Sequence, residues 1–254
     1  MSRRDLLASV AQTPRSTSAG PCDLPILYRD GAQLGVFYAS PLEAARAVLA
    51  RTSLEPWPLF GRAITTIQAW SYRDSTVGSY GEVGLGIVAR KKGSRPSLLK
   101  LGMDMRDQEE QGIWVCTLPV TTEAAWAAGV ELWGYPKYVT PITSDFGARE
   151  ARVRLGDELE ITVEAGRGLS LPSLPVVTLT SLGGRLIRTV IETQMALRWT
   201  LGRTANVRIL GRGPTADAFE ALGLEGVRPL SAFRTDAFRA VLPEGRDIGA
   251  AGSG

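Results

Sequence analysis

The chain of 254 residues contains no histidine. Ser-His-Asp and Cys-His nucleophile systems both need an imidazole as general base, and histidine is the commonest ligand of catalytic metals. The absence of histidine therefore excludes these nucleophile systems and all histidine-based metal centres. Any catalysis must use lysine, tyrosine, carboxylates, serine, arginine or a bound cofactor.

Cysteine is scarce as well. Cys22 and Cys116 are isolated and form no CxxC spacing, which excludes a structural zinc site. A single long-range disulfide between them stays possible, but a reduced, cytoplasmic chain is the simpler interpretation. No apolar run reaches the ~18 residues of a membrane helix. The apolar stretch Leu6–Ala11 after the twin arginine is shorter than the ~7–15 residues of an export signal, so we expect no membrane association.

An excess of charge is also missing, because 29 lysines and arginines face 26 acidic residues, a net charge of +3. Nucleic-acid binding usually requires a concentrated basic stripe, so we expect no nucleic-acid partner. One basic and one acidic cluster stand out. We interpret the first as a solvated hairpin loop, with an anion contact as the alternative, and the second as a solvated turn and not a metal site. They contain Arg90, Lys91, Lys92 and Arg95, and Asp104, Asp107, Glu109 and Glu110.

What the chain has in abundance is strand-forming sequence. Nine runs rich in valine, isoleucine, threonine and aromatic residues are separated by Gly-, Pro- and Asp-containing breaks. These runs are Gln33–Tyr38, Arg62–Trp70, Glu82–Ala89, Ile113–Val120, Ala151–Leu155, Glu158–Ala165, Val176–Leu182, Arg185–Thr193 and Ala205–Leu210. Consecutive strands with few helices predict an α+β fold built on a mostly antiparallel sheet or barrel.

Helical patterns are few and short. Ser40 and Glu43 have the spacing of a capping box in front of an alanine-rich run. A second helix is predicted over Thr121–Val130, ended by Gly129, and a third over Pro214–Leu222. No linker divides the middle of the chain. We therefore expect a single domain over residues 21–249, between a flexible N-terminal tail (1–20) and a flexible C-terminal tail (250–254).

The third predicted helix begins with a dinucleotide-like pattern, Gly211-Arg212-Gly213-Pro214-Thr215-Ala216. A dinucleotide fold needs alternating strands and helices, whereas this chain has consecutive strands. Pro214 also removes a backbone N–H from the loop that would hold phosphate. A capped helix after a strand explains the pattern better.

The most unusual stretch is GVELWGYPKYV, from Gly129 to Val139, in which Lys137 follows a proline among aromatic residues. An amine attacks a ketone only in its neutral form, and a free lysine with a pKa near 10.4 is almost always charged at neutral pH. An apolar environment or a nearby cation can favour the neutral form. The alternative is a lysine at a strand edge whose stem lies on Trp133 or Tyr135.

This stretch resembles the active-site segment of the acetoacetate decarboxylase family, whose signature is roughly G-R-E-x-x-G/A-Y/F-P-K-K. Further likeness lies in SYGEVG (Ser79–Gly84) and in the passage from Leu197 to Leu230, and the resemblance extends from about Leu24 to Pro243. It implies a partly closed β-barrel with few peripheral helices. It also implies a Schiff base between Lys137 and a small keto acid, without any cofactor, in a homo-oligomer.

The resemblance further implies catalytic roles for Lys137 and Glu82. It places four residues at the substrate: Tyr138, Trp133, Tyr135 and Glu131. The chain departs from the signature where Tyr138 replaces the second lysine and Val130 replaces the arginine, and Arg29 matches the family's early arginine only if the register slips. Decarboxylation, aldol or dehydration chemistry from the same lysine, and a non-catalytic binding barrel all stay open.

Overall fold

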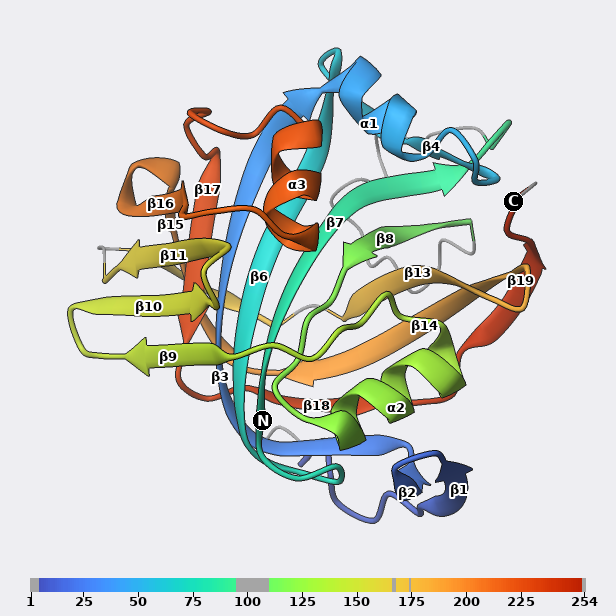
Figure 1. Ribbon diagram of the computed structural model, residues 1–254. Coiled ribbons are helices and arrows are strands. Elements are labelled where there is room, and N and C mark those ends of the chain that lie inside the picture. The colour runs from blue at the N-terminus through green and yellow to red at the C-terminus, as the bar shows by residue number, and fades with distance from the viewer. Residues whose placement is uncertain (1–4, 95–109, 166–167, 174, 253–254) are drawn as a thin grey trace.

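The computed structural model describes residues 5–94, 110–165, 168–173 and 175–252 (Figure 1). The helices are α1 (Leu42–Val48), α2 (Glu123–Trp133) and α3 (Pro214–Ala221), with a 3-10 turn at Gly202–Thr204. The strands of the first half are β1 (Thr13–Thr17), β2 (Gly20–Leu24), β3 (Ile26–Pro41), β4 (Leu54–Pro56), β5 (Pro58–Leu59), β6 (Arg62–Ser75), β7 (Tyr80–Lys91) and β8 (Gln111–Thr117). Those of the second half are β9 (Ile142–Phe146), β10 (Glu150–Leu155), β11 (Leu159–Glu164), β12 (Leu169–Pro172), β13 (Val176–Leu182), β14 (Arg185–Gln194), β15 (Ala196–Leu201), β16 (Ala205–Ile209), β17 (Ser231–Thr235), β18 (Arg239–Leu242) and β19 (Arg246–Ala250).

The large sheet closes on itself through the long strand β3. One edge of β3 pairs with β17 and β18, and its other edge pairs with β6. From β18 the ring continues through β14, β13, β8 and β7 back to β6. The β13–β8 pair is parallel, whereas the other pairs of the ring are antiparallel. The predicted mostly antiparallel, partly closed barrel is confirmed.

Strands β6 and β7 separate an outer core from the inside of the ring. In β6, Ile67 and Ala69 belong to the outer core, while the alternate residues Gln68 and Trp70 face inward. Because successive side chains of a strand point to opposite faces, one strand serves both sides. The outer core is closed by the small sheet β16-β11-β10-β9 and by α3, which lie in front of β3, β6 and β7 in Figure 1.

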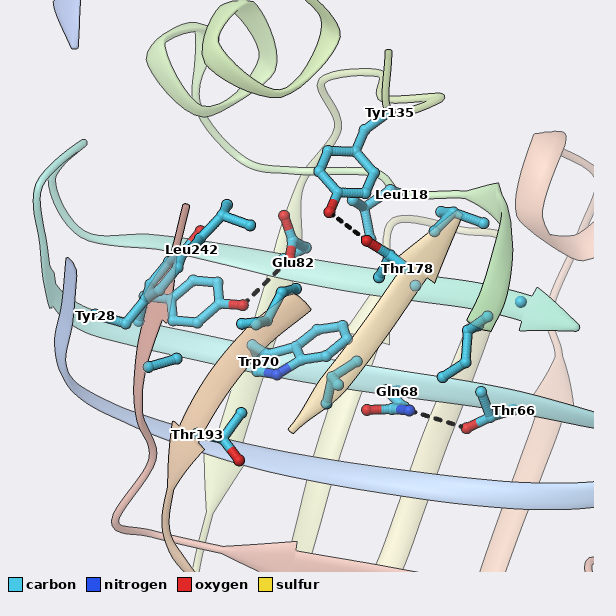
Figure 2. A pocket seen from close by; sticks show the side chains of 18 of the residues that line it. Tyr28, Thr66, Gln68, Trp70, Glu82, Leu118, Tyr135, Thr178, Thr193 and Leu242 are labelled. Carbon is cyan, nitrogen blue, oxygen red and sulfur yellow. Dashed lines mark hydrogen bonds between the residues drawn. The ribbon is translucent and has the colours of Figure 1, made fainter. Parts of the chain in front are cut away.

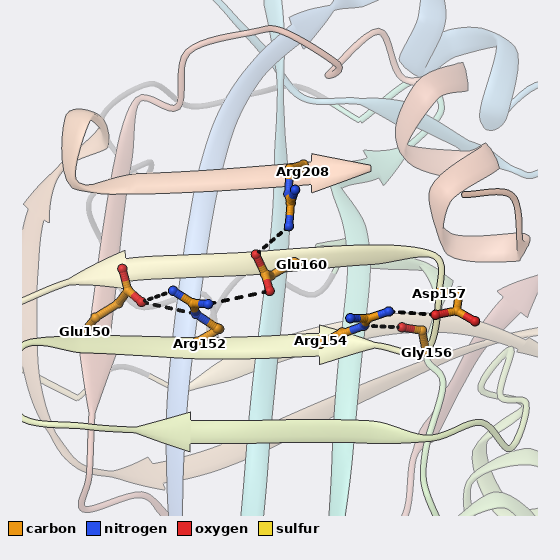
Figure 3. A network of polar contacts seen from close by, with 7 residues as sticks. All are labelled: Glu150, Arg152, Arg154, Gly156, Asp157, Glu160 and Arg208. Carbon is orange, nitrogen blue, oxygen red and sulfur yellow. Dashed lines mark hydrogen bonds and ion pairs between the residues drawn. The ribbon is translucent and has the colours of Figure 1, made fainter. Parts of the chain in front are cut away.

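The other face of the small sheet is charged and faces solvent (Figure 3). Glu160 of β11 accepts from Arg208 of β16 at 3.2 Å and lies 4.0 Å from Arg152 of β10, which also pairs with Glu150. Exposed pairs of this kind contribute little to stability individually. Their arrangement shows that this sheet has one buried and one solvated face.

Two helix predictions need correction. Ser40 does not cap α1, because its hydroxyl donates to the Ala63 carbonyl and lies 2.8 Å from the Thr65 hydroxyl inside β3–β6. The strand continues through this position, so its side chain is committed to the neighbouring strand. Helix α2 does not end at Gly129 but runs to Trp133, and Gly134, with φ +68°, ends it in the left-handed conformation.

Strands also lie near both ends of the described residues. Residues 13–20 hold β1 and the turn to β2, and β19 pairs with β14. Cys22 and Cys116 are both free. Arg95, Asp104, Asp107 and Glu109 lie outside the described residues, and within those residues no group of three His, Cys, Asp or Glu side chains is arranged to hold a metal ion. Among the described helices, none combines the length and the apolar composition that crossing a bilayer requires.

Candidate functional site

A cavity occupies the inside of the ring (Figure 2). Every ring strand contributes to its wall: Tyr28 from β3, Trp70 from β6, Glu82 from β7, Val115 from β8, Thr178 from β13, Ile191 from β14 and Leu242 from β18. Aromatic and aliphatic side chains make up most of the lining. Of the described residues that line it, Glu82 and Lys137 are the charged ones.

Lys137 reaches the cavity because the chain turns sharply after α2. The amide of Lys137 donates to the Tyr135 carbonyl at 2.8 Å, a tight turn around Pro136. The segment then runs beside residues 118–120, where Leu118 donates to the Pro136 carbonyl and Val120 to the Tyr138 carbonyl. These backbone hydrogen bonds fix the segment on both sides of Lys137.

The same stretch, residues 118–120, also holds Glu82. Glu82 and Val120 form an antiparallel bridge, while Val120 and Val139 form a parallel one. Val120 therefore lies between strand β7, which carries Glu82, and the segment after α2, which carries Lys137. Although 55 positions separate them, Lys137 Nζ lies 2.7 Å from Glu82 Oε2, and their side chains are only 6% and 8% exposed. This buried ion pair is the centre of the candidate site.

The stem of Lys137 passes directly over Gly129 of α2. A Cβ placed on Gly129 would lie 2.3 Å from Lys137 Cε and 2.9 Å from Nζ, well inside van der Waals contact. Only glycine leaves room for the lysine at this point of the helix. The glycine in the middle of the helix therefore has a packing role and does not mark the end of the helix.

Three tyrosines lie at the Glu82 end of the cavity. Tyr72 donates its hydroxyl to Glu82 Oε1 at 3.2 Å, and the hydroxyls of Tyr28 and Tyr80 are 3.0 Å apart. Burial, and then the negative charge of Glu82, raise the pKa of all three phenols well above the usual value of a tyrosine. They are therefore neutral phenols at physiological pH, and Tyr72 is a fixed proton donor to the carboxylate.

Two aromatic rings lie near the side-chain nitrogen of Lys137. Nζ lies 5.7 Å from the centroid of the Tyr80 ring and 5.9 Å from that of Tyr135. Tyr135 lines the cavity, and its hydroxyl pairs with Thr178 at 2.8 Å (Figure 2). Burial raises the pKa of this phenol. Such rings stabilise a cation by their negative faces while keeping water away.

Three of the predicted substrate-site residues lie elsewhere. Trp133 is fully buried behind Tyr135, and its indole N–H donates to the Pro243 carbonyl. Tyr138 points away from the cavity, and its hydroxyl donates to Glu158 Oε1 at 2.6 Å. Glu131 lies on the outer side of α2, where it accepts from Ser18. None of these three lines the cavity, whereas Lys137, Glu82 and Tyr135 do.

The sequence analysis missed Tyr28, Tyr72 and Gly129. Tyr72 lies two residues after the inward-facing Trp70, and residues two apart in a strand share a face. The sequence pattern could therefore have predicted that Tyr72 faces the cavity. Tyr28 comes to the site through the pairing of β3 with β18 and β6, which local sequence does not encode. Arg29, the uncertain match to the family's early arginine, is exposed and pairs with Asp74, outside the cavity.

Comparison with known proteins agrees with this arrangement. A model of the family described as acetoacetate decarboxylase matches residues 9–177, more than half of the chain and including both members of the buried ion pair. The chain belongs to the acetoacetate decarboxylase family. No curated protein matched the sequence in a separate search.

Solved structures of family enzymes share the fold at low sequence identity. An acetoacetate decarboxylase from Legionella pneumophila has 15% identity and a TM-score of 0.68, with 96% of this chain and 94% of that chain covered. The enduracididine biosynthesis enzyme MppR in complex with pyruvate has 15% identity and a TM-score of 0.63, with the same coverage. Another MppR structure holds the condensation product of pyruvate and imidazole 4-carboxaldehyde. An acetoacetate decarboxylase-like enzyme from Sphingomonas wittichii RW1 has 14% identity and a TM-score of 0.58, covering 87% and 92%.

Proposed function

We propose that the protein is a carbon–carbon lyase that forms a Schiff base between Lys137 and a small keto acid. The observation that supports this most directly is the buried pair of Lys137 and Glu82, 2.7 Å apart, at the wall of an apolar cavity. A buried amine beside a carboxylate has both a nucleophile and a proton acceptor at hand.

The reaction begins when Lys137 Nζ gives one proton to Glu82 and attacks the keto carbon. Glu82 returns this proton to the carbinolamine oxygen, then takes a second proton from the nitrogen and delivers it to the resulting hydroxyl, which leaves as water, so that a protonated imine forms. In a β-keto acid the electron pair of the bond to the carboxylate moves toward the imine nitrogen as carbon dioxide leaves. Protonation of the resulting enamine at carbon, followed by hydrolysis, releases the ketone and Lys137. Tyr72, which donates to the other oxygen of Glu82, holds this carboxylate in position.

Aldol or dehydration chemistry from the same lysine is the second candidate. MppR shares this fold and has been solved with pyruvate and with a pyruvate–aldehyde condensation product. In that reaction the enamine of the bound keto acid attacks an aldehyde, and no carbon dioxide leaves. A non-catalytic small-molecule-binding barrel is the remaining alternative.

Borohydride trapping tests the proposal. The protein is incubated with acetoacetate, pyruvate or acetylacetone at pH values from ~6 to ~9, since the attacking amine must be neutral. Borohydride then reduces any imine to a stable secondary amine, and intact mass and peptide mapping locate it. We expect one adduct, on the peptide that contains Lys137.

The matched controls are two lysine variants. Lys137→Ala should abolish the adduct, whereas Lys92→Ala, which removes an exposed amine that contacts the Thr52 carbonyl, should leave it intact. Release of carbon dioxide from acetoacetate together with an adduct supports decarboxylation. An adduct with pyruvate, without release of carbon dioxide from acetoacetate, supports aldol or dehydration chemistry. If no carbonyl compound gives an adduct, the protein is a binder and the proposal is wrong.

A further inference from the structure

The cavity extends well beyond the Lys137–Glu82 pair along β6 and β7. The inward positions of β7 after Glu82 are Gly84 and Gly86, and they face Gln68 and Thr66 of β6 in the register. A Cβ on Gly84 would lie 2.9 Å from Leu118 and 3.3 Å from Trp70. The missing side chain of Gly84 therefore leaves room for Leu118 and Trp70 to pack there, and the cavity lining continues past Glu82 to Gln68 and Thr66.

The far end of this space is polar. Gln68 and Thr66 are 6% and 2% exposed, and both line the cavity (Figure 2). Gln33 Nε2 donates to Gln68 Oε1 at 2.8 Å, and Gln68 Nε2 donates to Thr66 Oγ1 at 3.2 Å. The side-chain oxygen Oε1 of Gln33, a residue that does not itself line the cavity, is buried and has no partner among the described residues. Buried polar atoms without partners are uncommon in folded proteins.

Reversing the two amides does not satisfy this chain of hydrogen bonds. If both are turned, Gln68 donates to Gln33 and Thr66 donates to Gln68, and the Gln33 amino group then lacks the acceptor that Gln68 offered. In the orientation described, the Thr66 hydroxyl accepts from Gln68, so its own hydrogen can be donated into the cavity. The Thr66 hydroxyl can therefore donate to a ligand group, and the second lone pair of Gln68 Oε1 can accept from one.

The middle of the space is apolar. Trp70 and Leu118 line it between the reacting pair and the polar end, and Val115 is level with Thr66 in the strand register. Gln68 lies two residues from Trp70, the residue opposite Glu82, a separation of about 7 Å along a strand. A phenyl ring or a short alkyl chain spans such a distance.

We propose, resting on the Schiff-base function, that the natural substrate carries an apolar, aryl-sized body and a neutral hydroxyl group beyond its reacting carbonyl. The body lies against Trp70, and the hydroxyl binds Gln68 and Thr66. A hydroxyl both donates and accepts, as this end requires, whereas a carboxylate only accepts and a buried charge without a partner is costly. The polar end of the cavity is thus a subsite for the uncharged hydroxyl end of the substrate.

Two matched ketones test this inference with the intact protein. Benzylacetone and its para-hydroxy analogue differ only in the terminal hydroxyl, and acetylacetone is too short to reach the subsite. The half-saturation concentration for borohydride-trapped adduct on Lys137 is measured for each. We expect the hydroxylated ketone to bind about five- to tenfold more tightly than benzylacetone, as one net neutral hydrogen bond provides.

Variants of the subsite separate the possible outcomes. Thr66→Val should remove the preference for the hydroxylated ketone, Thr66→Ser should keep it, and Thr143→Val on exposed β9 should change nothing. Gly84→Ala should raise the half-saturation concentration of both aryl ketones, while acetylacetone still forms its adduct. This second variant keeps the test valid even if Thr66→Val fails to fold. If acetylacetone is trapped normally but the hydroxyl gives no advantage, or Thr66→Val retains the advantage, the subsite is refuted and the Schiff-base function stands. If not even acetylacetone is trapped, both proposals fail.

Discussion

Replacing Gly129 by alanine tests the position of Lys137, because the substitution moves the lysine side chain but does not remove it. Carbon atoms in contact prefer about 3.5 Å or more, whereas the new Cβ would lie 2.3 Å from Lys137 Cε. The lysine stem must therefore move by about 1 Å or more, because the helix backbone is held by its own hydrogen bonds. Nζ then leaves its 2.7 Å position beside Glu82. A displacement of this size at a reacting group can cost about 100-fold in rate.

The helix itself should tolerate the change. Gly129 has an ordinary helical backbone, and alanine is favoured over glycine inside a helix by about 1 kcal/mol. We therefore expect Gly129→Ala to keep its circular dichroism spectrum and melting temperature while forming the Lys137 adduct with acetylacetone about 100-fold more slowly. The reverse substitution Ala124→Gly, on the exposed side of α2, controls for helix propensity and should leave the trapping rate unchanged. Trapping by Gly129→Ala at the rate of the unmodified protein would show that the close contact with the stem does not position the amine.

Three further predictions concern stability. Tyr28, Tyr72 and Tyr80 have raised pKa values in the folded state, so above about pH 10 the unfolded chain loses phenol protons that the folded chain keeps. Urea denaturation should therefore show stability falling above that pH by up to about 1.4 kcal/mol per pH unit for each tyrosine, and a flat profile between pH 9 and 11 would contradict this. Tyr138→Phe removes a hydrogen bond to a carboxylate and should cost about 1–2 kcal/mol in urea denaturation, yet change acetylacetone trapping less than twofold. Thr122→Ala removes the side-chain cap of α2 and should lower the unfolding free energy measured by urea denaturation by about 1 kcal/mol. An unchanged unfolding free energy would contradict this prediction.

Much of the fold could be predicted from local sequence. All nine expected strand runs lie wholly or largely in strands, because β-branched and aromatic residues alternate there between an outer and an inner face. The strands that were missed are short or interrupted: β2 contains Pro21, and β18 spans only Arg239–Leu242. Their pairing depends on partners far away in the chain, which local patterns do not reveal.

The candidate site was only partly predictable for the same reason. The resemblance identified Lys137 and Glu82, and the structure brings them together through Val120. It did not separate Tyr135, which faces the cavity, from Tyr138, which faces Glu158. The difference between the two tyrosines depends on the tight turn at Pro136. Tyr135 and Lys137 on either side of the turn line the cavity, whereas the next residue, Tyr138, does not.

The closure of the ring has a consequence for the order in which the site can form. Strand β18, near the end of the chain, completes the wall by pairing with β3, near its beginning. A ribosome synthesises Tyr28, Glu82 and Lys137 long before it reaches Ala240 and Leu242, which also line the cavity. Pairings between such distant segments form late because of the entropy of closing long loops. The nascent chain therefore carries Lys137 in an incomplete ring, and the cavity can be enclosed only after β18 has been synthesised.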